Sequence, residues 1–226
     1  MEIVGNYFRV FCHLFAVATL FGGCSAIKDY PKSQIRDGSY KFKQGNSHFQ
    51  KAYAYVKNDT VRVILQKDTN NIILPANKGN QIFLRQSFDL DLIVVPFKYR
   101  PATTLPRQLT TEFNGNVFVG YRVDRYSLTY EQTRLGLPKS YKHYALSIGG
   151  FAGLGSTSVT PWTTNYGTTE EYMGLVLTRG LGILVGVNNL TVGAGVGWDI
   201  LTDRDRNIWV YQNKAWYGLT LGLNLN

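Results

Sequence analysis

Five charged residues stand where a strand pattern would turn them away from water. Asp89 and Asp91 share one face of the alternating segment 88–99, and Arg122 and Asp124 share one face of the segment 115–130. Asp199 lies on the glycine-rich face of a third such segment, 191–200. Because a buried charge needs a partner, these residues predict a lumen charge network of salt bridges inside a sheet. The alternative is a path for protons or ions along the same side chains.

Catalysis is the second chemistry that these residue types allow. His143 stands at the start of a predicted strand, and Ser147 follows four residues later on the same face. A hydrolase or acyltransferase needs a histidine beside a nucleophilic serine, together with a group that orients the histidine. Two positions on one face of one strand do not make such a triad, so we predict no catalytic residues. The alternative is a barrel enzyme that modifies lipids through His143.

The sequence predicts neither a metal site nor a cofactor. Residues 203–207 match the first ligand positions of a calcium loop, but Ile208 replaces the required glycine and Lys214 replaces the closing acid. We interpret this stretch as a solvated hairpin loop.

The elements that would position these residues are long segments with a period of two, the mark of a strand. Six of them follow one another: 88–99, 115–130, 144–159, 172–187, 191–200 and 216–226. A hairpin at 49–66 precedes them, after a polar tether with one short strand at 39–42. Six strands plus two predict an all-β fold, an antiparallel up-and-down β-barrel of about eight strands. The expected regions are a leader (1–23), a tether (24–47), a hairpin region (48–86) and a barrel (87–226).

Each long segment has one hydrocarbon face and one face of glycine and small polar residues. The hydrocarbon face suits lipid contact, and the small residues suit a narrow lumen. We predict that Trp198, Trp209, Trp216 and Tyr217 are interfacial aromatic residues. The alternative is a lipocalin-like barrel or a sandwich whose apolar face is its core and which binds an apolar ligand.

The net charge bears on the class of binding partner, and the positions of the cysteines bear on disulfide bonds. The net charge is +9, but the basic residues are dispersed near predicted turns, which favours an anionic membrane surface over nucleic acid. The two cysteines, Cys12 and Cys24, both lie in the first 24 residues, so no disulfide framework is predicted for the rest of the chain.

The first residues have the layout of a secretory signal peptide, with Arg9 before the apolar run 10–23. The run ends in Leu-Phe-Gly-Gly-Cys-Ser, which resembles the lipobox of bacterial lipoproteins. That resemblance implies that Cys24 carries a diacylglyceride and becomes the new N-terminus. The alternatives are an ordinary signal peptide cut after Ala26 and an uncleaved anchor.

Residues 88–226 resemble the small outer-membrane β-barrels of Gram-negative bacteria, and residues 207–226 resemble the tail of uncharacterised lipoproteins of that class. The resemblance implies a lipid-anchored protein of the cell outer membrane, on its periplasmic or its surface side. Its partners would be outer membrane lipid and other envelope proteins. Its role would be structural, adaptor or cell-surface, without catalysis.

Overall fold

The computed structural model describes residues 34–57, 60–65, 80–130, 139–187 and 190–223. The chain divides into two compact units, Met1–Pro31 and Lys32–Asn226, and every described residue belongs to the second. The leader, Cys24 and the first part of the tether lie outside the described residues. Within the described ranges, no helix is long and apolar enough to cross a membrane.

The described residues form ten strands and two short 3-10 helices. The strands are β1 (Gly38–Gln44), β2 (Gln50–Lys57), β3 (Thr60–Leu65), β4 (Gln81–Arg100), β5 (Gln108–Thr110), β6 (Asn114–Tyr130), β7 (Lys139–Val159), β8 (Tyr172–Val187), β9 (Leu190–Leu201) and β10 (Ala215–Leu223). The 3-10 helices are η1 (Trp162–Thr164) and η2 (Arg204–Asn207), both in loops. The six long segments of the sequence correspond to β4, β6, β7, β8, β9 and β10.

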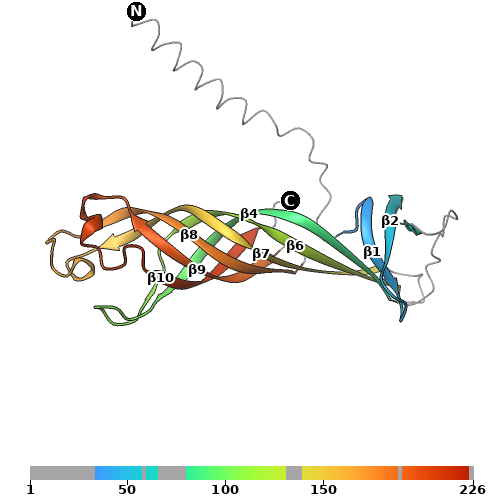
Figure 1. Ribbon diagram of the computed structural model, residues 1–226, viewed down its shortest axis with the longest axis horizontal. Helices are drawn as coiled ribbons and strands as arrows, with labels where there is room; N and C mark the ends of the chain where they lie inside the picture. The colour runs from blue at the N-terminus through green and yellow to red at the C-terminus, as the bar shows by residue number, and fades with distance from the viewer. Residues whose placement is uncertain (1–33, 58–59, 66–79, 131–138, 188–189, 224–226) are drawn as a thin grey trace, which may run out of the picture. The chain divides into compact units, whose positions relative to one another are not determined.

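These six strands form an antiparallel ring, which confirms the predicted fold class. Each strand from β4 through β6, β7, β8 and β9 to β10 pairs with the next. The ring closes where β10 pairs back with β4, from Tyr217 opposite Tyr99 to Leu223 opposite Leu92. Figure 1 shows the long strands of the ring lying next to one another. The ring has six strands rather than the eight we counted, because β2 and β3 pair outside it.

Strands β1, β2 and β3 form an extension of the sheet from the first residues of β4. β1 pairs with β2 and with residues 81–84 of β4, and β2 pairs with β3. Tyr40 and Phe42 on β1 are buried against Phe83 of β4. This contact stabilises the short strand that the sequence predicts at 39–42 within the tether, because two aromatic side chains on one face of β1 cover the apolar face of the hairpin.

A bulge in β4 changes which side chains face the interior. Leu219 of β10 lies opposite Phe97, whereas Leu221 lies opposite Val94, so β4 has one extra residue at this point. Pro96 lies within this irregularity, as expected for a residue that cannot donate to the ladder. Between Asp89 and Val95, before the bulge, the odd-numbered residues of β4 are buried, and after it Lys98 and Arg100 are buried.

The hydrocarbon faces of the ring strands point outward. We call the following exposed side chains the outer belt: Leu90, Leu92, Val94, Val117, Val119, Tyr121, Leu146, Ile148, Leu181, Ile183, Val185, Val192, Leu219 and Leu221. The opposite faces are buried inside the ring, where glycines let the wall approach large side chains. A Cβ on Gly197 would lie 2.3 Å from Cζ2 of Trp216, so only glycine fits there.

Candidate functional site: charged clusters inside the ring

Strand β4 runs along the wall of the ring and contributes buried side chains to each layer of the interior in turn. Its buried residues run from Phe83, beside the extension, through Asp89 and Asp91 to Ile93 and Val95. Lys98 and Arg100 follow beyond the bulge. The interior is therefore built of alternating apolar and charged layers.

An apolar layer separates the two charged clusters along β4. It consists of Ile93, Val95, Phe118, Phe151, Leu184 and Trp216, each at most 4% exposed. These side chains come from five of the six ring strands and contact one another, so they fill the ring. A filled ring disfavours the predicted alternative of an ion path through it.

The first charged cluster is the Arg122 cluster: Asp89, Arg122, Asp124, His143 and Ser147, all buried. Arg122 donates from Nε to Asp124 Oδ1 (2.9 Å) and from Nη1 to Asp89 Oδ1 (3.3 Å). One guanidinium therefore bridges two carboxylates from neighbouring strands. These contacts bring together three of the five charges in the predicted lumen network.

His143 and Ser147 belong to this cluster, but they do not form a catalytic pair. Ser147 Oγ donates to Asp89 Oδ2 at 2.5 Å, whereas His143 Nε2 lies 2.8 Å from Asp124 Oδ1. Because an ionised carboxylate only accepts, the proton of this contact is on Nε2. The His143 ring also stacks on Tyr126 with the centroids 4.7 Å apart. Each side chain is thus held by a different carboxylate, and His143 is not the hydrogen-bond partner of Ser147.

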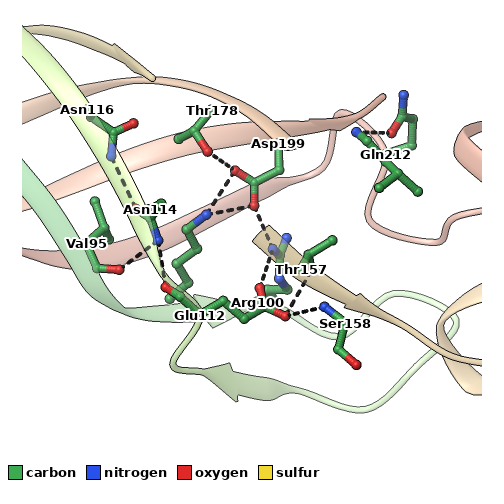
Figure 2. A network of polar contacts seen from close by, with 12 residues as sticks. Val95, Arg100, Glu112, Asn114, Asn116, Thr157, Ser158, Thr178, Asp199 and Gln212 are labelled. Atoms are coloured by element: carbon green, nitrogen blue, oxygen red, sulfur yellow. Dashed lines mark hydrogen bonds and ion pairs between the residues drawn. The ribbon is translucent and has the colours of Figure 1, made fainter. Parts of the chain in front are cut away.

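The second cluster is the Asp199 cluster: Lys98, Arg100, Glu112, Thr178 and Asp199. Asp199 accepts hydrogen bonds from Lys98 Nζ (3.0 and 3.1 Å), Arg100 Nη2 (2.6 Å) and Thr178 Oγ1 (2.8 Å). Figure 2 shows its carboxylate between Thr178 and the basic side chains. Glu112 Oε2 lies 3.9 Å from Arg100 Nη2, so two carboxylates balance two cations.

Glu112 also ties the loop before β6 to the wall of the ring. Its Oε1 accepts hydrogen bonds from Thr157 Oγ1 and from the backbone N–H of Ser158, each at 2.9 Å. Asn114 donates to the Val95 carbonyl at 3.0 Å, beside the β4 bulge. The bulge that turns Lys98 and Arg100 inward is therefore fixed by side chains of the next strand.

Aromatic rings cover both cations of the Asp199 cluster. Lys98 Nζ lies 4.7 Å from the Trp216 ring centroid, and the Arg100 guanidinium lies 5.5 Å from Trp209 and 4.8 Å from Tyr211. Cation–π contacts of this kind stabilise desolvated cations. Tyr211 is in the loop before β10, where burial raises the pKa of its phenol above the usual value.

Two of the four residues predicted to be interfacial aromatics are inside the ring instead. Trp209 and Trp216 are at most 3% exposed, because they cover the cations that the β4 bulge turns inward. Tyr217 is exposed, and Trp198 is half-buried on the outward face of β9. Only these last two are positioned to meet surrounding molecules.

Four of the five predicted network charges lie in the two clusters, three of them in the Arg122 cluster and one, Asp199, in the other. Asp199 pairs with Lys98 and Arg100 and not with Arg122, and Asp91 is buried on β4 between Asp89 and the apolar layer. Lys98 and Arg100 were missed because an unbroken alternation from Asp89 would turn them outward. The signal that could have found them is Pro96, a residue that marks a bulge inside a strand pattern.

Two acidic residues of the loop 203–207, which the sequence predicts to be a solvated hairpin loop, accept hydrogen bonds from β8. Asp203 Oδ2 accepts the backbone N–H of Leu175 at 3.2 Å, and Asp205 Oδ2 accepts the Tyr172 hydroxyl at 3.0 Å. Among the described residues, no group of three or more His, Cys, Asp or Glu side chains is arranged to hold a metal ion.

Comparisons with known proteins complete the description of the site. No protein-family model, no curated protein and no solved structure matches this chain.

Proposed function

We propose that this chain is a membrane β-barrel protein that inserts through its six-stranded ring. The outer belt is the observation that supports the proposal. Water-soluble proteins rarely expose a continuous apolar patch of more than a few hundred Å², whereas here exposed hydrocarbon side chains come from every ring strand. The charges of the Arg122 and Asp199 clusters are arranged the other way, inside the ring and paired, as expected for a lipid-surrounded barrel.

We further propose that the protein is anchored by lipid on Cys24 in the outer membrane and has a structural, adaptor or cell-surface role. The filled ring supports a role at the surface of the protein, since Phe118, Phe151 and Trp216 occupy the space that a pore or an apolar ligand would need. The separate contacts of His143 and Ser147 favour a non-catalytic role.

Insertion is tested by a lysine on the outer belt. Ile183 is 51% exposed and lies between the outer-belt residues Leu181 and Val185 of β8. In a lipid-facing wall, Ile183→Lys should cost about 2–4 kcal/mol and reduce the fraction of protein that inserts into liposomes. Phe113→Lys is the matched control, because Phe113 is 75% exposed in a loop.

The readouts are flotation with liposomes and heat-modifiable migration in gels. Retained flotation of Phe113→Lys with loss for Ile183→Lys supports insertion. A wild-type protein that stays folded in water, together with an Ile183→Lys variant that is merely more soluble, refutes it.

Anchoring is tested separately in cells of a Gram-negative host. Cys24→Ser should abolish incorporation of labelled palmitate, while Cys12→Ser should leave it unchanged, since only Cys24 follows the lipobox-like residues. Equal labelling of both variants would contradict the anchor without affecting the barrel proposal.

A further inference from the structure

The outer face of the ring has a groove where two small residues interrupt the apolar wall. Outward positions of β7 carry Leu146, Ile148 and Leu154, but Gly150 and Ala152 stand between them. The groove has a volume of about 880 Å³ and is flanked by Val119 of β6 and Leu181 of β8, which lie opposite Gly150 in the two ladders.

The fold does not require glycine at this position. A Cβ on Gly150 would meet no atom closer than 3.6 Å, whereas one on the neighbouring Gly149 would lie 2.2 Å from a backbone oxygen. Gly149 is thus explained by close packing of the wall, and Gly150 is not. The space above Gly150 is available for an occupant about as wide as an acyl chain.

One end of the groove carries positive charge. Arg179 is exposed on the otherwise apolar outward face of β8, opposite Ala152 on one side and Trp198 on the other. Within the described part of the chain, no carboxylate contacts Arg179. Trp198 in turn lies opposite Ala215, and the exposed Asn213 and Lys214 immediately precede that residue.

This end also carries polar side chains. On β7 the outward positions beyond Leu154 are Ser156 and Ser158, and Asn213 lines the groove itself, whereas Leu175 and Leu177 continue the apolar outward face of β8. The groove therefore has an apolar floor and a cationic end with a tryptophan and hydrogen-bonding side chains beside it. Arginine and tryptophan side chains of this kind commonly anchor a protein at the level of the lipid headgroups.

We infer that this groove binds an anionic phospholipid, with an acyl chain over Gly150 and Ala152 and the phosphate beside Arg179. The inference rests on the proposed membrane insertion and adds the ligand class and its position. Charge complementarity selects the headgroup, because a basic residue near a membrane surface favours anionic over zwitterionic lipid.

The test uses quenching of Trp198 fluorescence by brominated lipids. The full-length protein, in a Trp162→Phe background, is reconstituted into phosphatidylcholine bilayers that contain brominated phosphatidylglycerol or brominated phosphatidylcholine. Trp209 and Trp216 are buried, so lipid quenching reports mainly on Trp198. We expect quenching by phosphatidylglycerol to saturate at about fivefold lower lipid fraction, the factor expected for one basic residue.

Two variants locate the site, each with a matched control. Arg179→Gln should remove the preference for phosphatidylglycerol, whereas Arg107→Gln, an exposed loop arginine, should keep it. Gly150→Leu should weaken the quenching by both lipids because it fills the groove without a clash, whereas Leu219→Phe on β10 should not.

The measurement distinguishes failure of the lipid site from failure of membrane insertion. Equal quenching by the two lipids, or a preference unchanged by Arg179→Gln, overturns the lipid site while insertion stands. Absence of quenching by either lipid refutes the membrane insertion and the lipid site together.

Discussion

Asp199→Asn should destabilise the ring more than any single substitution of a loop charge. Asp199 is fully buried and accepts four hydrogen bonds, two of them from Lys98 and one from Arg100. Asparagine keeps the shape of the side chain but leaves two buried cations with only one carboxylate, Glu112, at 3.9 Å from Arg100. Removing one partner of a buried ion pair costs about 3–5 kcal/mol.

Solvent does not screen this ion pair, because the side chains of Lys98 and Asp199 are at most 1% exposed, so the range for buried pairs applies. The loss should lie near its lower limit, since the Trp216 ring still covers Lys98 and Glu112 still faces Arg100. Lys98→Met in the Asp199→Asn background should recover about 1–2 kcal/mol, because an apolar side chain then replaces an unpaired cation.

Urea unfolding in liposomes, followed by tryptophan fluorescence, measures both effects. Glu171→Gln is the control, an exposed carboxylate in the loop before β8. A loss below about 1 kcal/mol for Asp199→Asn, or a further loss on adding Lys98→Met, would refute the claim that Asp199 neutralises this cluster.

Gly197→Val should lower the free energy of unfolding by about 1–3 kcal/mol in the same assay, because the new Cβ would lie 2.3 Å from Trp216. Gly150→Val is the control, since its Cβ meets no such clash, and it should cost less than about 1 kcal/mol. Similar losses for both variants would contradict the claim that Gly197 is required by close packing against Trp216. Burial and the hydrogen bond to Asp205 raise the pKa of Tyr172, which lies beyond the outer belt at the loop end of β8, so its contribution to stability is complete below about pH 10 and is lost above it. Tyr172→Phe should flatten the alkaline part of the stability–pH curve, and an unchanged slope would show that this phenol is not linked to folding.

The alternation of the sequence predicted the six ring strands and which side chains share a face, because successive side chains leave opposite faces of a strand. The hydrocarbon face, which carries Ile183 and Leu219, points outward in the structure, as the membrane-barrel hypothesis predicts. What alternation could not predict is the bulge at Pro96, because a single extra residue reverses the faces of everything after it. Lys98 and Arg100 were therefore missed.

Long-range partners were the second limit of the sequence. The short strand predicted at 39–42 is present within β1, but nothing local in residues 38–44 indicates that they pair with residues 81–84 of β4. The same holds for Ser147, whose partner Asp89 stands on a strand two places away in the ring. Contacts of this kind depend on the register of three strands at once, which no single segment encodes.

The closure of the ring has a consequence for the order of folding. Tyr217 and Tyr99 stand more than a hundred residues apart in the chain, whereas the strands of the other ring ladders are consecutive in the chain or separated only by β5. Pairing across such a separation is slow, because a long loop must be ordered before the contact contributes any stability. Until β10 arrives, β4 and β9 each present an unpaired edge that can join another chain. We therefore expect the last strand to decide whether a newly made chain closes on itself or aggregates.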